Sequence, residues 1–318
     1  MLVVYRHAVN GLKTAGQPVS SFMYGMQEIF HNFRMPVFFI LSGIFLAGSL
    51  KRKSKAEVVK NRSATLLYPY LLWAVILSCI QIGFSNVTNS HRGWDHLLNI
   101  IVQPREVDHM WYLFALFNTS LFYVGMNFFF KRTELGHLIL GLLLHFVSFY
   151  VQQYSLVSDV FYFYIFFSTG AYLSPIFLDK AKREKFLDVS RLKWLLPLFV
   201  IGQWFWFTHE DMNAYNALFL VINFVACYVV YLTAYSIAKS GKNEWLAYIG
   251  KHSLYIYILH VPFAAIARIA ILHVYHGINI WLLLLFCWLF GIIAPIVLVS
   301  TFRRWGIERL FSLQTKTS

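Results

Sequence analysis

The sequence predicts an all-α protein, a polytopic bundle of transmembrane helices, and three observations support this prediction. Of its 318 residues, 58% are hydrophobic and only 13% are charged, whereas a soluble domain has roughly 45–50% apolar and about 25% charged residues. The apolar residues gather in segments of about 20, the length that a helix needs to cross ~30 Å of hydrocarbon. Lysine and arginine concentrate in every second connection between these segments, as in membrane proteins of fixed orientation.

Each apolar segment of this length is expected to form one helix. Residues 1–9 are also apolar, but as a helix they rise only about 14 Å, so we expect a truncated first helix, either half-length or begun before Met1. We expect one integral membrane domain over 1–301 and a short tail over 302–318. Segments 96–103 and 304–313 are amphipathic enough to lie at the membrane interface. The nine complete spans are expected at 33–50, 64–84, 109–130, 135–151, 156–178, 194–207, 215–238, 248–271 and 278–301.

The basic residues are distributed unevenly over the two sides of this predicted bundle. Counted over the connections and the tail, one side holds 21 Lys and Arg and the other side holds four. The positive-inside rule makes the richer side cytoplasmic, so we expect a cytoplasmic C-terminus and an inner (plasma) membrane location, in contact with lipid. Topology thus explains the net charge of +13, and we expect no nucleic-acid partner. The three cysteines lie inside apolar runs without metal-ligand spacing, so neither a metal site nor a disulfide framework is expected.

Ionisable residues at membrane depth are costly, and they mark either a function or a paired structural role. His7, near the outer end of the first helix, is either an interfacial histidine beside Arg6 or a general base that takes a proton from a hydroxyl. His109 opens a helix with the sequence HMWYL. It is either an interfacial anchor or, with Trp111 and Tyr112, part of a substrate or catalytic rim.

A second polar group lies on one helix face, because Ser253, Tyr257 and His260 are spaced i, i+4 and i+7. These residues either form hydrogen bonds between helices or line a substrate pathway.

The segment KRKSKAEVVKNR at 51–62 is strongly basic and directly precedes a helix. It binds either anionic lipid or a polyphosphate-bearing cofactor, and Lys60 and Arg62 are the residues placed best for the latter. The small residues Ser42 and Gly43 in the preceding span either allow close helix packing or form a narrow passage for a thin substrate chain.

Six segments together suggest a family. Their order, spacing and topology over residues 2–263 resemble the acyltransferase type 3 family of membrane enzymes, whose members O-acylate sugars. FRMPVFFILSG and HMWYL are also similar to the glucan biosynthesis protein C and fucose 4-O-acetylase-like subgroups. In chain order the six segments are LVVYRHA, FRMPVFFILSGIFL, KNRSATLLYPYLLW, HMWYLFALF, FYFYIFFSTGAYL and YIGKHSLYIYILHVPF.

The resemblance implies transfer of an acyl group from cytoplasmic acyl-CoA to a hydroxyl of a cell-envelope or exported sugar. Acetyl-CoA is the donor that we expect, and succinyl transfer remains open. The family motifs match His7, Lys60, Arg62, His109, Trp111, Ser253 and His260. With the other polar residues of these segments, the site that we expect has His7 as general base, with His109 and His260, for catalysis; Lys60, Arg62 and Ser42 for the donor; and Arg34, Trp111, Tyr112, Ser253 and Tyr257 for the substrate.

Two other hypotheses remain open beside the enzyme. A transporter or flippase of a lipid-linked sugar would use the same polar residues without chemistry, but such folds often have related halves and broken helices, and the sequence suggests neither. A non-catalytic membrane protein derived from an acyltransferase is the other hypothesis. It is kept open by two departures from the family pattern: the arginine about ten residues before His7 would precede Met1, and Thr65 stands where the basic motif has its second arginine.

Overall fold

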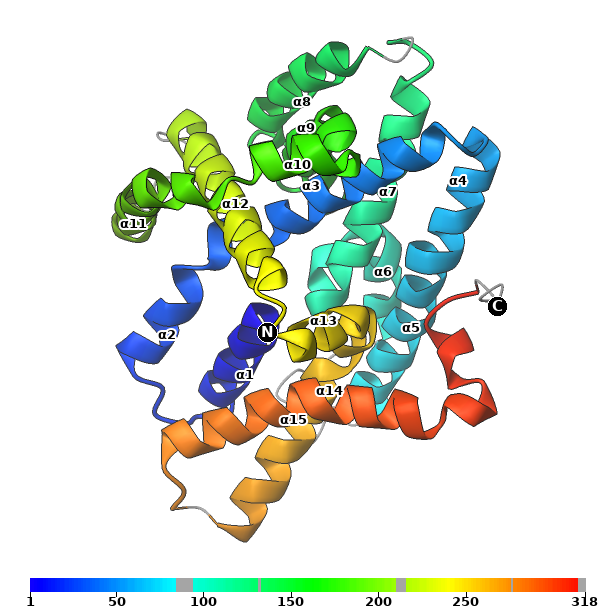
Figure 1. Cartoon of the computed structure of the whole chain (residues 1–318). Coiled ribbons are helices and arrows are strands. Elements are labelled where there is room, and N and C mark those ends of the chain that lie inside the picture. The colour runs from blue at the N-terminus through cyan, green and yellow to red at the C-terminus, as the bar shows by residue number, and fades with distance from the viewer. Residues whose placement is uncertain (84–93, 131–132, 210–215, 276, 314–318) are drawn as a thin grey trace.

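Helices make up the regular structure throughout the part of the chain that is described (Figure 1). The structure, a computed structural model, describes all residues except 84–93, 131–132, 210–215, 276 and 314–318. The expectation of an all-α membrane bundle is confirmed. The helices are α1 (Leu2–Thr14), α2 (Ser21–Glu28), α3 (His31–Leu50), α4 (Lys55–Arg62), α5 (Tyr68–Gly83), α6 (Asn99–Val102), α7 (Trp111–Met126), α8 (Glu134–Ser148), α9 (Ser155–Leu178), α10 (Lys180–Phe186), α11 (Leu192–Thr208), α12 (Asn216–Lys239), α13 (Glu244–Lys251), α14 (Ser253–Val274) and α15 (Ile280–Thr301), with a π-helix at Ser63–Leu67.

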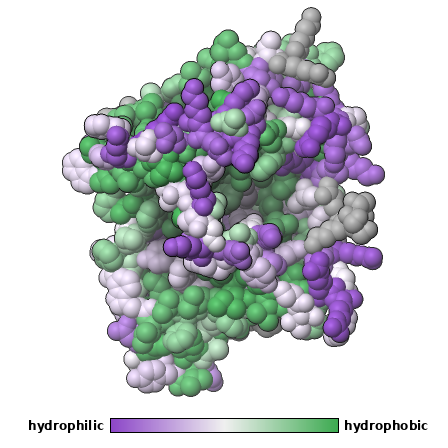
Figure 2. Space-filling model, viewed as in Figure 1, coloured by the Kyte–Doolittle hydropathy of each residue, from purple (hydrophilic) through white to green (hydrophobic). Residues whose placement is uncertain are grey.

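Each of the nine predicted spans coincides with one or more of these helices. Within the described residues, six helical stretches are long and apolar enough to cross a membrane, so the count of nine remains a prediction. Apolar side chains cover α15 in Figure 2, and Leu282, Phe286 and Ile293 on this helix are about half exposed. An exposed apolar face of this kind suits contact with lipid. The six stretches are Ser21–Leu50, Lys55–Gly83, Ser155–Leu178, Asn216–Lys239, Ser253–Val274 and Ile280–Thr301.

The predicted span at 248–271 differs from the structure, which divides this stretch into α13 and α14 at His252. None of the residues of α13 is buried, and this short helix carries Glu244 and Lys251. It therefore lies on the surface, and only α14 enters the bundle. The first helix also extends five residues beyond the predicted end at Val9, to Thr14.

Helices α3 and α9 pack against each other more extensively than any other pair of described helices (Figure 1). Two glycines bring the backbones into contact: a Cβ added at Gly43 would lie 2.0 Å from the carbonyl oxygen of Phe167, and one at Gly170 would lie 1.9 Å from that of Ile40. Ser174 adds a hydrogen bond from its hydroxyl to the carbonyl oxygen of Ile44, at 2.8 Å. Small residues at such a crossing are the usual means of close helix packing in membranes.

Helix α1 packs against α14 and α15 and buries one side between them. Gly291 on α15 allows this approach, because a Cβ there would lie 3.0 Å from Val4. The start of α1 is held by two hydrogen bonds to its carbonyl groups, from Trp288 to Met1 at 3.2 Å and from Arg34 to Leu2 at 3.4 Å. These contacts fix the position of His7 in the bundle.

The C-terminal segment folds back onto the bundle in two short 3₁₀ turns, at Arg303–Trp305 and Ile307–Leu310. Phe311 is buried between the rings of Trp73 and Tyr255, at 5.2 and 4.8 Å. The N–H of Leu313 donates to the carbonyl oxygen of Ala64 in the π-helix, at 3.2 Å. That carbonyl needs an outside donor, since the residue five positions on is Pro69, which has no N–H.

Two opposite faces of the bundle can be defined from the chain direction. The basic segments 51–62, 180–186 and 191–193 lie at the end of α3, after the end of α9 and at the start of α11. We call the side that carries them the basic face, and Figure 2 shows hydrophilic side chains gathered over α10 and around α4. The other ends of α3, α9 and α11 form the opposite face.

Candidate functional site

Three histidines from distant parts of the chain meet inside the bundle. His7 comes from α1, His109 from the turn before α7, and His260 from α14. Their ring centroids are 5.7 Å apart for His7 and His109, 5.1 Å for His7 and His260, and 4.8 Å for His109 and His260. We call these three residues the histidine cluster. Among the described residues, no group of three His, Cys, Asp or Glu has the arrangement of a metal site.

Two members of the cluster are fixed by backbone carbonyls. His109 Nε2 lies 3.0 Å from the carbonyl oxygen of Ile258, and His260 Nδ1 lies 2.9 and 2.8 Å from those of Ile256 and Tyr257. A carbonyl oxygen only accepts, so these ring nitrogens carry the proton and donate. In the neutral rings the other nitrogens, Nδ1 of His109 and Nε2 of His260, then have lone pairs and are buried without a hydrogen-bond partner.

Exposure distinguishes His7 from the other two. His109 is 4% exposed and His260 is fully buried, whereas His7 is only partly buried. Because His7 alone of the three is partly exposed, it is the most accessible member of the cluster.

His109 enters the core because the backbone turns sharply before it. Asp108 has a φ of +49°, a left-handed conformation that is uncommon for residues other than glycine and is more readily adopted by Asp. Tyr257 then holds the turn, because its hydroxyl donates to the carbonyl oxygen of His109. Together with the bond from His109 to Ile258, this fastens the start of α7 to α14 at two points.

Two arginines surround His7. Arg34 is 6% exposed and reaches from the start of α3 to the carbonyl of Leu2. Both Arg34 and Arg6 are close enough to His7 to interact with it electrostatically. Nη1 of Arg6 and Nε of Arg34 are buried and have no hydrogen-bond partner, so each guanidinium group has an N–H donor that the protein does not satisfy.

Arg62 lies on the side of the cluster toward the basic face. It donates to the hydroxyl of Ser42 at 2.8 Å and to the carbonyl oxygen of the same residue at 3.2 Å. Tyr112 lies near enough to interact electrostatically with Arg62, and its ring is 5.5 Å from that of Tyr257. Polar side chains therefore extend from Arg62 through two tyrosines to the histidine cluster.

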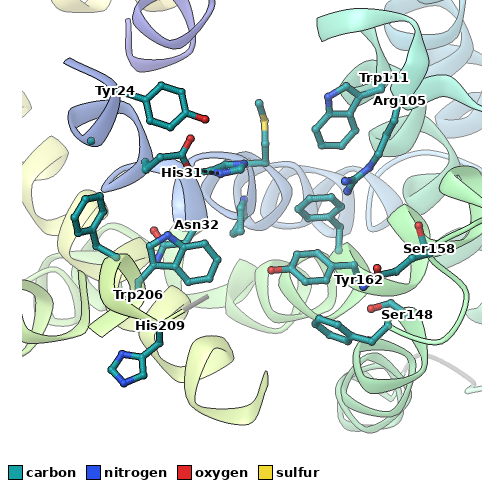
Figure 3. A pocket seen from close by; sticks show the side chains of 18 of the residues that line it. Tyr24, His31, Asn32, Arg105, Trp111, Ser148, Ser158, Tyr162, Trp206 and His209 are labelled. Carbon is teal, nitrogen blue, oxygen red and sulfur yellow. Dashed lines mark hydrogen bonds and ion pairs between the residues drawn. The ribbon is translucent and has the colours of Figure 1, made fainter. Parts of the chain in front are cut away.

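The remaining residues expected at the site lie at its margins. Lys60 is exposed on α4, and Ser253 is exposed at the start of α14, seven residues before His260. Trp111 lies on the other side of the cluster, in the wall of a cleft on the opposite face (Figure 3).

This cleft contains polar residues that the sequence did not predict to be functional. Arg105 lies over the ring of Trp111, with its guanidinium carbon 4.8 Å from the ring centroid, and pairs with Asp159 at 2.5 Å. Asp159 is fully buried. A carboxylate in the first turns of an apolar span needs a partner, and Arg105 lies in a connection predicted on the same side, so the sequence held a signal for this pair. Asn32, buried at the start of α3, gave no such signal.

A family model described as an acyltransferase domain matches residues 1–301, nearly the whole chain. No curated protein and no solved structure matches the chain. The match ends at the last residue of α15, so the C-terminal segment that contacts Ala64 lies beyond it. The chain belongs to the acyltransferase type 3 family and is a membrane acyltransferase.

Proposed function

We propose that the protein transfers an acetyl group from acetyl-CoA to a hydroxyl of a cell-envelope or exported sugar, across the inner (plasma) membrane. The observation that carries this proposal is the histidine cluster, which lies between the Arg62 side of the bundle and the cleft on the opposite face. The basic face is cytoplasmic in this proposal, following the positive-inside rule. It receives the CoA nucleotide, and the sugar approaches from the other side.

The reaction needs one proton acceptor and one site of positive charge. A ring nitrogen of His7 takes the proton of the sugar hydroxyl as its oxygen attacks the thioester carbonyl carbon. The N–H groups of Arg6 and Arg34 stabilise the negative oxygen of the tetrahedral intermediate. The C–S bond then breaks, the CoA sulfur leaves as thiolate, and protonated His7 returns the proton to it. His109 and His260, fixed by backbone carbonyls, form the wall against which His7 is held.

The donor is expected to bind through its phosphates and pantetheine arm. Lys60 attracts the phosphates at the membrane surface, where a lysine acts as a point charge. Arg62 and Ser42 mark the point where the arm enters the bundle. A succinyl donor would use the same path, and competition between acetyl-CoA and succinyl-CoA in the assay below decides between them.

Sealed vesicles of opposite orientation test the proposed sidedness. Everted membrane vesicles with a glucan trapped inside, given radiolabelled acetyl-CoA outside, are expected to acetylate the trapped glucan. Sealed right-side-out vesicles with the same contents are expected to transfer little label, because CoA does not cross the bilayer. Transfer that requires donor and glucan on the same side would overturn the proposal. Passage of unlabelled glucan across the membrane would indicate a transporter instead.

Replacing Arg62 by alanine is expected to raise the KM for acetyl-CoA about tenfold or more, since a charged hydrogen-bonding group at a binding site is worth roughly 1.5–3 kcal/mol. The change in kcat is expected to be smaller. Lys51, exposed in the same basic segment, provides the matched control, and Lys51→Ala should change KM less than twofold. Equal KM values in the Arg62 and Lys51 variants would show that Arg62 does not contribute to binding of the donor.

A further inference from the structure

The cleft on the opposite face is large and is formed by several helix ends. Its volume is about 1080 Å³. It lies among α2, which carries Tyr24, and the end of α1, the start of α3, the start of α7, the end of α8, the start of α9 and the end of α11 (Figure 3). Ligand pockets that enclose drug-sized molecules measure roughly 300–1,000 Å³. The cleft therefore exceeds what one sugar ring needs and has room for several.

Aromatic rings line this cleft on more than one side. In Figure 3, Trp111 and Tyr162 lie on one side, and Tyr24 and Trp206 lie on the other. An aromatic face is electron-rich and packs against weakly positive C–H groups. The apolar faces of a pyranose ring present such C–H groups, whereas its edges carry hydroxyls. Rings on two sides of one cleft suit a chain of sugar units.

Hydrogen-bonding groups lie between the rings, and one of them has no partner in the protein. Asn32 is 6% exposed, and its Oδ1 accepts from the N–H of Phe33 at 2.9 Å. Its Nδ2 group is buried without a hydrogen-bond partner although the residue lines the cleft. A buried donor left unpaired costs free energy. The Nδ2 group of Asn32 therefore needs an acceptor, which an oxygen atom of a ligand in the cleft would supply. Ser148 and Ser158 have oxygen lone pairs that accept from hydroxyls.

The charges of the cleft are largely compensated within the protein. Arg105 is paired with Asp159, and Glu28 lies 3.1 Å from His31. Lys13 lies over the ring of Tyr24, at 4.5 Å from its centroid. A strongly anionic ligand would need unpaired cations, so this pairing favours a neutral one.

We propose that the cleft binds a neutral oligosaccharide chain of several units, and that the reacting hydroxyl belongs to the unit nearest the histidine cluster. This inference rests on the proposed function and specifies its acceptor. The cleft and the cluster are linked at two places along the chain: Lys13 and His7 both lie on α1, and Trp111 follows His109 by two residues. Asn32 of the cleft also lies two residues before Arg34 at the start of α3. In this proposal, a chain held by Trp206 and Tyr24 extends toward His7, which lies on α1 six residues before the cleft residue Lys13.

The test measures acceptors of increasing length on the wild-type protein and on three tryptophan variants. Purified protein in nanodiscs is given radiolabelled acetyl-CoA and unmodified gluco-oligosaccharides from one to six units. The expected KM falls at least tenfold from glucose to the hexasaccharide. Trp206→Ala is expected to raise the KM for the hexasaccharide about tenfold, and to leave the KM for glucose within twofold, because only a longer chain reaches this ring. Trp204→Ala is the matched control, since Trp204 is on the same helix and 65% exposed. Trp206→Phe keeps an aromatic ring and is expected to restore most of the affinity.

Binding without turnover separates this inference from the proposed function. Quenching of tryptophan fluorescence by the hexasaccharide is measured in the same nanodiscs without acetyl-CoA, for wild type and for Asn32→Ala. Saturable quenching that weakens in Asn32→Ala supports the cleft even if no label is transferred, in which case only the proposed function fails. Acetylation with a KM independent of chain length would overturn the cleft proposal and leave the proposed function standing. Tighter binding of a sulfated chain than of the neutral one would also overturn it.

Discussion

Replacing His7 by alanine is expected to lower acyl transfer at least about 100-fold, because a positioned general acid–base group contributes roughly 10²–10⁴-fold to a rate. Its neighbours cannot take over this role. His109 and His260 are buried and are held by hydrogen bonds to Ile258, Ile256 and Tyr257, so neither ring can turn toward a substrate hydroxyl without losing its backbone partner. The measurement is incorporation of radiolabel from acetyl-CoA into a glucan, by protein purified in detergent or nanodiscs.

Controls separate this loss of chemistry from loss of structure. His273→Ala removes an exposed histidine near the end of α14 and should leave the rate within twofold. His7→Gln keeps a hydrogen-bonding side chain of similar size but cannot take up a proton near neutral pH, so it should be as inactive as the alanine variant. Both His7 variants should elute and melt like wild type. If His7→Gln retained more than a tenth of the wild-type rate, His7 would be a positioning residue and not the base.

The sequence predicted the histidine cluster better than the cleft, and there is a physical reason for the difference. A histidine inside an apolar segment is unusual enough to be noticed alone, and His7, His109 and His260 each lie in such a segment. That the three side chains meet depends on how the helices pack, and the sequence alone does not specify this packing.

The direction in which a membrane helix faces is poorly encoded when both of its sides are apolar. Helix α9 buries residues on most of its circumference, and α11, with the sequence LKWLLPLFVIGQWFWFT, is apolar on nearly every side. A helix that is hydrophobic all round has no polar stripe from which its orientation can be read. The contributions of Tyr162 and Trp206 to one cleft could therefore not be predicted, although both residues lie in predicted spans.

The packing of the C-terminal segment was also not predictable from its sequence pattern. Its amphipathic pattern indicated an interfacial position, and the exposed Trp305 agrees with that. The burial of Phe311 depends on a gap beside Trp73 and Tyr255, and on a free carbonyl at Ala64, neither of which can be inferred from residues 304–313.

The largest effect on stability is expected from Gly170→Ala at the crossing of α3 and α9. Its new Cβ would lie 1.9 Å from the carbonyl oxygen of Ile40 and 2.7 Å from the carbonyl carbon. Both atoms are backbone, so no side-chain rotation relieves the overlap, and the helices must separate. Overpacking of a core typically costs about 1–3 kcal/mol, and more where nothing can move. Alanine's higher helix propensity offsets only about 1 kcal/mol of this.

Gly125→Ala on α7 is the matched control for that variant. Nothing lies within 4 Å of the Cβ that it would add, so it gains helix propensity without overlap and should melt at or slightly above the wild-type temperature. Thermal unfolding in detergent, followed by the loss of the monodisperse gel-filtration peak, measures both variants. Gly170→Ala should lose its peak many degrees earlier, or fail to accumulate in the membrane. Equal melting temperatures of the two variants would mean that α3 and α9 lie farther apart at this crossing than these distances indicate.

The same separation of helices is expected to reach both proposed binding sites. Helix α3 carries Ser42 toward the basic face and Asn32 toward the cleft, and α9 carries Asp159 and Tyr162. Moving α3 away from α9 would displace the hydroxyl that accepts from Arg62 and widen the cleft in one step. Gly170→Ala protein that still folds should therefore show raised KM values for both acetyl-CoA and the acceptor chain. By contrast, Arg62→Ala is expected to raise only the KM for acetyl-CoA, and Trp206→Ala only the KM for the acceptor chain. Because the backbone contact lies between the two sites, a loss confined to one of them would show that α3 does not move as a rigid unit.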